Sequence, residues 1–127
     1  MAQYADIVGI DAPASAVAAE VVNINVRVKN LHSAPIGMCA VAYLEYGISP
    51  LPAVTMPENV ANVDAGVTHS FAGYFTMPDS DVTIYAYSYW YGTDGQWHYD
   101  DYMTKIVSIG EVEEMFSDFA IIGLNKV

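Results

Sequence analysis

The sequence is poor in several residue types, and each shortage argues against a class of protein. A single cysteine, Cys39, excludes an intramolecular disulfide and a zinc site built from several thiolates. Only 4 Lys and Arg residues stand against 15 Asp and Glu residues, which gives a formal net charge of -11 at pH 7. Because such a surface repels phosphate backbones and anionic lipid headgroups, we expect neither nucleic acid nor a membrane as a partner.

Long apolar runs are also missing. No run approaches the roughly 18 residues of a membrane-spanning helix, and Met1–Asp6 lacks the basic and apolar regions of a secretory signal. Hydrophobic residues nevertheless make up 54% of the 127 residues, which is enough to build a core and argues against disorder. We therefore expect one compact, acidic domain.

Apolar and polar residues alternate with a period of two along most of the chain. The clearest case is Glu20–Asn30, where Val22, Ile24, Val26 and Val28 are separated by polar residues. Because successive side chains of a strand point to opposite faces, this pattern predicts a strand with one buried face.

The same reasoning predicts further strands and a fold. They are expected at residues 4–10, 38–46, 60–63, 67–77, 82–91 and 96–109, with 12–19 as a loop. In the strand 67–77, Val67, His69, Phe71, Gly73 and Phe75 share one face. Connections this short cannot carry parallel crossovers. The sequence therefore predicts an all-β fold, an antiparallel immunoglobulin-like β-sandwich of about seven strands over residues 1–110, followed by a C-terminal extension at 111–127.

Two stretches carry a resemblance to known domains. Ile10–Pro13 together with Glu20–Asn30 resembles the opening of CARDB-like prokaryotic immunoglobulin-type domains, and Ala65–Ile84 resembles immunoglobulin-like modules of phage virion proteins and bacterial surface proteins. The likeness spans roughly residues 7–109. It implies a sandwich fold and brings no catalytic residues, because such domains serve many roles.

Residues that enzymes use do not gather in a motif. His32, His69 and His98 lie in three separate segments, and Cys39 lies inside an apolar strand where thiols are usually inert. We therefore expect no enzymatic activity and no cofactor.

Calcium is the best metal candidate, on weak grounds. The candidate ligands lie in or after turns: Asp79, Asp81, Asp94, Asp100 and Asp101. Their spacing fits no EF-hand loop, and aspartate is common in turns because its carboxylate binds nearby backbone N–H groups. We therefore assign no metal site.

The most unusual feature is a row of tyrosines on one face of the strand 82–91. Tyr85, Tyr87, Tyr89 and Tyr91 form the row, and Trp97 and Tyr99 lie across the hairpin. Such a row has two interpretations. It packs within the protein, in the core or across strands, because aromatic residues favour strands, or it forms an exposed surface that binds a protein or a glycan.

The C-terminal segment ends in an apolar stretch. Its large residues are Phe116, Phe119, Ile121, Ile122 and Leu124. We expect either an additional edge strand of the chain's own sheet or an arm that adds to the sheet of a neighbouring subunit.

Together these features predict a structural protein without enzymatic activity. Our first hypothesis is a virion component of a phage or virus, such as a capsid decoration or accessory protein, that binds other virion or surface proteins and forms a homo-oligomer. A start at Met1 without an export signal fits a protein released by lysis. The alternative is a carbohydrate-binding or adhesive module, secreted or on the cell surface.

Overall fold

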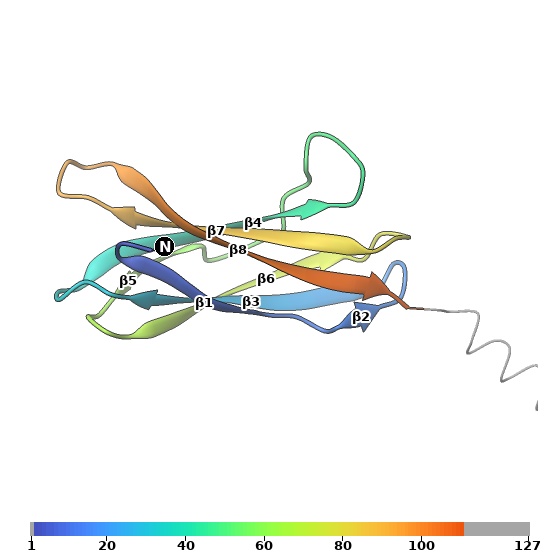
Figure 1. The fold of residues 1–127 in the computed structure, drawn as a ribbon, viewed down its shortest axis with the longest axis horizontal. Helices are drawn as coiled ribbons and strands as arrows, with labels where there is room; N and C mark the ends of the chain where they lie inside the picture. Colours follow the sequence, from blue (N-terminus) through green and yellow to red (C-terminus); the bar gives the residue numbers. More distant parts are fainter. Residues whose placement is uncertain (1, 111–127) are drawn as a thin grey trace, which may run out of the picture.

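Residues 2–110, the part of the chain that the computed structural model describes, form two stacked β-sheets (Figure 1). The strands are β1 (Ala5–Asp11), β2 (Ser15–Ala16), β3 (Val21–Asn30), β4 (Ile36–Glu45), β5 (Val60–Val63), β6 (Thr68–Thr76), β7 (Val82–Tyr91) and β8 (Trp97–Ile109). The smaller sheet has the order β1-β3-β6 and the larger has the order β2-β8-β7-β4-β5. This arrangement confirms the predicted all-β sandwich. The described residues contain no helix that could cross a membrane.

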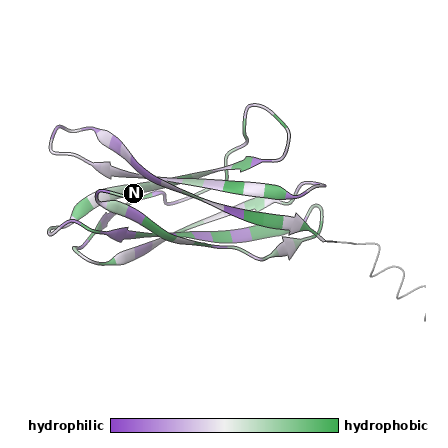
Figure 2. Cartoon of the chain, in the orientation of Figure 1, coloured by the Kyte–Doolittle hydropathy of each residue, from purple (hydrophilic) through white to green (hydrophobic). Residues whose placement is uncertain are grey.

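The core lies between the two sheets and follows the alternation in the sequence. In β3, Val22, Ile24, Val26 and Val28 are at most 2% exposed, while their neighbours along the strand point outward. Hydrophobic and hydrophilic residues follow one another along the strands in Figure 2. The larger sheet contributes apolar side chains of β4 and β7 to the same core, among them the fully buried Ile84.

Two local predictions were wrong. The expected loop 12–19 contains β2, which pairs in parallel with Ser108 and Ile109 of β8. This pair joins strands far apart in the chain, so the crossover argument does not apply to it. Val67, expected to open the strand on the same face as Phe71, precedes β6 and is 47% exposed, because it still belongs to the turn, where its N–H donates to the carbonyl of Asp64.

A β-bulge in β8 changes which of its side chains point outward. Ser88 of β7 pairs with Asp101, whereas the next residue, Tyr89, pairs with Tyr99, so Asp100 is an extra residue in β8. An extra residue reverses the alternation beyond it. As a result Tyr99 and Tyr102, an odd and an even position, lie on the same outer face.

The bulge also aims Asp100 at the N-terminal segment. Its carboxylate accepts hydrogen bonds from the backbone N–H groups of Gln3, Tyr4 and Ala5, at 2.7–2.8 Å. β1 is an edge strand, so these three N–H groups have no neighbouring strand to bind on that side. The carboxylate of Asp100 accepts the hydrogen bonds that a neighbouring strand would otherwise accept.

Two more side chains join β1 to the larger sheet. The Asp101 carboxylate accepts a hydrogen bond from the N–H of Ile7 at 3.0 Å. The hydroxyl of Ser88, which is fully buried, donates to the carbonyl oxygen of Ala5 at 2.6 Å. The two sheets are thus closed along this side by side chain–backbone bonds in place of strand pairing.

Candidate functional site: an aromatic outer face

The strongest candidate site is the outer face of the larger sheet, which we call the aromatic face. It combines the tyrosine row of β7 with outward side chains of β4, β5 and β8. Its members are Cys39, Val41, Tyr43, Val60, Tyr85, Tyr87, Tyr89, Tyr91, Trp97, Tyr99, Tyr102 and Ile106. The structure therefore brings together the six aromatic residues that the sequence singled out, Tyr85, Tyr87, Tyr89, Tyr91, Trp97 and Tyr99.

Strand register arranges the rings in rows across the sheet. Tyr87 of β7 lies between Val41 of β4 and Tyr102 of β8. Its ring centroid is 6.1 Å from that of Tyr99 and 6.4 Å from that of Tyr102. A further edge-to-face pair joins Tyr91 and Trp97 at 5.1 Å. These separations are typical of favourable aromatic pairs, so each ring holds its neighbours in place.

Exposure excludes the core for the tyrosine row and leaves a part of each interpretation. Tyr91, Trp97, Tyr99 and Tyr102 are 45%, 42%, 54% and 58% exposed. Tyr85, Tyr87 and Tyr89 are half-buried by their neighbours on the sheet. The row therefore lies outside the core and packs across strands. A contiguous apolar surface of this kind is characteristic of binding sites.

The aromatic face is also nearly free of charge. Among the outward positions of β4, β5, β7 and β8, all of them in the described residues, Glu45 at the end of β4 is the one charged residue. The outer face of the smaller sheet is different: β3 presents Arg27 and Lys29 there, and Arg27 forms an ion pair with Asp11 at 2.9 Å. The outer face of the larger sheet is therefore aromatic and almost uncharged, whereas the outer face of the smaller sheet carries charged side chains.

Two phenol groups of the aromatic face, those of Tyr89 and Tyr99, have pKa values raised above the ordinary value, and so does the thiol of Cys39. Desolvation raises the pKa of Tyr89 above its ordinary value, with a smaller effect from the nearby Tyr43. Desolvation also raises the pKa of Tyr99, and the charge of Asp101 adds to the effect. Burial raises the pKa of the Cys39 thiol in the same way. Neutral hydroxyls both donate and accept hydrogen bonds, so this face can bind polar atoms without using charge.

One end of the aromatic face is hollowed. A shallow depression of about 350 Å³ lies beside Trp97 and Tyr91, with Val60 and the amide side chain of Asn62 on its border. Aromatic rings with a nearby amide suit a small polar ligand or a protruding side chain.

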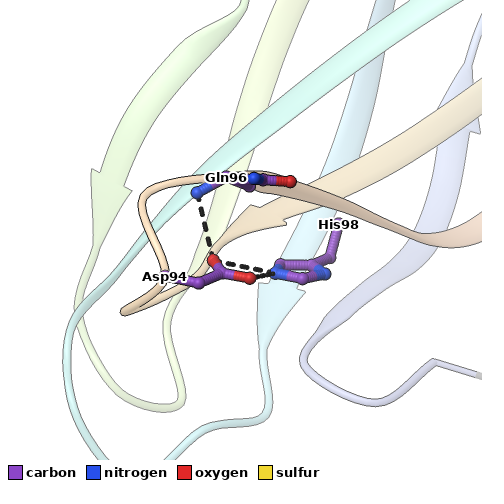
Figure 3. A network of polar contacts seen from close by, with 3 residues as sticks. All are labelled: Asp94, Gln96 and His98. Atoms are coloured by element: carbon purple, nitrogen blue, oxygen red, sulfur yellow. Dashed lines mark hydrogen bonds and ion pairs between the residues drawn. The ribbon is translucent and has the colours of Figure 1, made fainter.

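The hairpin between β7 and β8 holds a polar pair that sequence reasoning missed (Figure 3). The His98 Nε2 atom lies 2.9 Å from Oδ2 of Asp94, and Oδ1 of Asp94 accepts a hydrogen bond from the N–H of Gln96. The His98 contact, followed by the Gln96 bond, holds the pKa of Asp94 below its ordinary value. The pair could have been inferred from the sequence, because Asp94 and His98 are four residues apart on the two sides of a tight turn.

The histidines are packed as rings. His98 stacks on Trp90 with centroids 4.3 Å apart, and Trp90 meets the edge of Tyr4 at 4.9 Å. Tyr4 in turn contacts His32 at 4.7 Å. His69 packs on Phe71 in the other sheet. These contacts explain the histidines as parts of aromatic clusters.

The calcium candidates bind backbone N–H groups or lie exposed. Asp100 and Asp101 hold the N-terminal segment, Asp81 accepts a bond from the N–H of Ile109 at 2.7 Å, Asp94 caps the hairpin turn, and Asp79 is exposed. Within residues 2–110, no three His, Cys, Asp or Glu side chains are grouped so as to hold a metal ion. Turn and edge chemistry therefore accounts for four of these five carboxylates.

The second group of predicted interface residues falls elsewhere in the chain. Phe116, Phe119, Ile121, Ile122 and Leu124 lie outside the described residues. The prediction of an edge strand or a swapped arm stays a prediction.

Comparison with known proteins supports the fold. No family model matches the sequence, and a search of curated proteins found no relative. Among solved structures, the chain is similar to the crystal structure of a CARDB domain from Pyrococcus furiosus, determined in complex with di-metal ions. The TM-score is 0.60 at 14% identity, over 87% of this chain and 92% of that domain. This likeness shows the fold alone, a CARDB-like, immunoglobulin-type β-sandwich.

Proposed function

We propose that this protein is a non-catalytic interaction module that binds another protein through the aromatic face. One observation carries the proposal: a contiguous, exposed and almost uncharged aromatic surface on a chain whose net charge is -11. Tyrosine and tryptophan are the residues most often found as energetic anchors of protein interfaces. Their rings are already fixed by one another, so binding would cost little side-chain entropy.

Within this class we propose a structural role on a phage or viral particle, as a decoration or accessory protein. A sequence with few charged and many aromatic residues suits a subunit of a permanent assembly. A module bound across an assembled shell stabilises that shell by mass action, because it binds the assembled state in preference to the free subunits.

The proposal is tested by cosedimentation of the full chain with purified particles of its source. Tyr99→Arg places a charge in the centre of the aromatic face, and we expect it to weaken binding by at least about tenfold, the scale of a lost anchor. Asn25→Arg introduces the same charge on the outer face of the smaller sheet and is the matched control. Equal binding by both variants would contradict a role for the aromatic face, and a wild-type chain that binds no particle would contradict the particle role.

The depression beside Trp97 and Tyr91 favours a second candidate, a carbohydrate-binding module. Sugar rings stack on exposed aromatic rings, and the Asn62 amide could bind a sugar hydroxyl. A glycan array probed with the wild type and with Trp97→Ala separates the candidates. Sugar binding that is lost in Trp97→Ala would support the glycan site, and an array without signal would leave the protein interface as the function.

A further inference from the structure

We infer that the partner on the aromatic face is a second copy of this chain, bound about a two-fold axis. This inference rests on the proposed function, an interface on the aromatic face, and names a partner that would compete with a particle for that face. It is carried by three features of the aromatic face: its self-complementary chemistry, its area, and the near absence of charged residues among its own positions.

The first feature is self-complementary chemistry. In a two-fold interface, residues near the axis face their own copies, so a charged residue there would meet its like. The central positions of the aromatic face, Tyr87, Tyr89, Tyr99 and Tyr102, carry no charge. A phenol hydroxyl can both donate and accept a hydrogen bond, so two tyrosines that face each other can bind through one hydroxyl that donates and one that accepts. The face is therefore suited to bind itself.

The second feature is area. Six members of the face are between 42% and 60% exposed: Val60, Tyr91, Trp97, Tyr99, Tyr102 and Ile106. With about 200 Å² for a fully exposed large side chain, they present roughly 630 Å² per copy. The half-buried tyrosines add to this total and bring the face close to the ~800 Å² per partner that a standard interface buries.

The third feature is the placement of charge. Each chain has a net charge of -11, so two copies repel one another wherever their acidic residues meet. The aromatic face presents only Glu45, at its border, so contact through this face keeps most carboxylates apart. A different partner for so acidic a chain would gain speed and specificity from opposite charge at the contact, and this face offers no charge for that purpose.

The inference is tested by sedimentation equilibrium of the full chain. We expect the wild type to form dimers. Tyr102→Arg should remain monomeric, because the two introduced arginines would repel each other across the interface. Asn25→Arg is the matched control and should dimerise as the wild type does. Because the remaining force between the copies is repulsive, dimerisation should strengthen when salt is raised from about 0.01 M to about 0.15 M.

Cys39 supplies a second readout in the unmodified chain. It is the one cysteine of the sequence and lies on the aromatic face opposite Tyr89. Its alkylation by a small maleimide should slow as the wild-type concentration rises through the dimerisation range. In Tyr102→Arg the alkylation rate should be independent of protein concentration, and circular dichroism spectra that match those of the wild type would show that the variant is folded.

The outcomes separate this inference from the proposed function. A wild type that stays monomeric overturns the inference, and loss of particle binding in Tyr99→Arg would then still support a different protein partner. Dimers that persist in Tyr102→Arg with unprotected Cys39 also overturn it, since the copies would then meet elsewhere. Should the chain be monomeric and the arginine variants bind particles normally, both proposals fail.

Discussion

At the residue scale, aspartate side chains near the start of β1 act in opposite directions. Asp100 and Asp101 stabilise the fold as acceptors of backbone hydrogen bonds. Asp6 lies close to them, and desolvation together with the charge of Asp101 raises its pKa above the ordinary value. A carboxyl group with a raised pKa is more easily protonated in the folded state than in the unfolded state. Its charge therefore opposes folding at neutral pH.

The variant Asp6→Asn should be more stable than the wild type at pH 7, by about 0.5 kcal/mol, the scale of an exposed charge pair. As pH falls through the raised pKa, the wild-type folded state takes up the proton first, so the difference shrinks. It should vanish below about pH 3.9, the ordinary pKa of aspartate. Urea unfolding at several pH values measures this, with Asp79→Asn as control. A difference that is the same at every pH would contradict the explanation.

Sequence reasoning reached these residues only in part. The role of Asp94 is local, as expected of an aspartate in a turn, whereas Asp81 accepts a hydrogen bond from Ile109, 28 residues later in the chain. The role of Asp100 is different, because its partners lie about 95 residues earlier in the chain. No local sequence pattern reveals such a contact. The sequence therefore does not distinguish an aspartate that binds a metal ion from one that binds backbone N–H groups.

At the scale of elements, the bulge in β8 has two consequences. It turns Tyr102 outward to join Tyr99 on the aromatic face, and it directs Asp100 to the free edge of β1. Exposed strand edges invite pairing with other chains, and carboxylates placed along them prevent it. The same local irregularity therefore completes one surface of the molecule and protects another.

Asp100→Ala should lower the free energy of unfolding by about 2 kcal/mol, because three backbone N–H groups lose their acceptor. Urea unfolding of the full chain measures the change. The control is Asp79→Ala, an exposed aspartate whose removal should change stability by less than about 0.5 kcal/mol. Similar values for the two variants would show that water replaces the Asp100 carboxylate without cost.

Alternation predicted the longer strands well because their periodicity is a local property of each segment. In β3 the alternation placed Val22, Ile24, Val26 and Val28 on the buried face, and in β7 it placed the four tyrosines on one shared face. Whether that face was buried or exposed stayed open in the sequence. β2 was missed because a strand of two residues is too short to show alternation, and because its partner Ser108 is more than 90 residues away in the chain. The bulge was missed because Asp100 and Asp101 look like ordinary polar positions of a strand.

At the scale of the whole molecule, charge and aromatic surface are separated. Within residues 2–110, every acidic residue except Glu45 lies outside the aromatic face, and the larger sheet keeps its outer face almost neutral. Crowded like charges destabilise a compact state, and dissolved salt screens them.

The fold itself should therefore become more stable with salt. We expect Tm to rise by a few degrees when NaCl is raised from about 0.01 M to about 0.15 M, since screening relieves self-repulsion. Differential scanning calorimetry measures this best on Tyr102→Arg, because dimerisation would also raise the Tm of the wild type. A Tm that falls with salt would mean that ion pairs such as Arg27–Asp11 outweigh the repulsion.

The positions of the two tryptophans give the protein a pair of built-in optical reporters. Trp97 lies exposed on the aromatic face, whereas Trp90 is held between Tyr4 and His98 where the N-terminal segment meets the hairpin. Emission from Trp97 should shift to shorter wavelength when a partner covers that face, while emission from Trp90 follows the docking of the first residues. Removal of either indole would let fluorescence follow one event without the other.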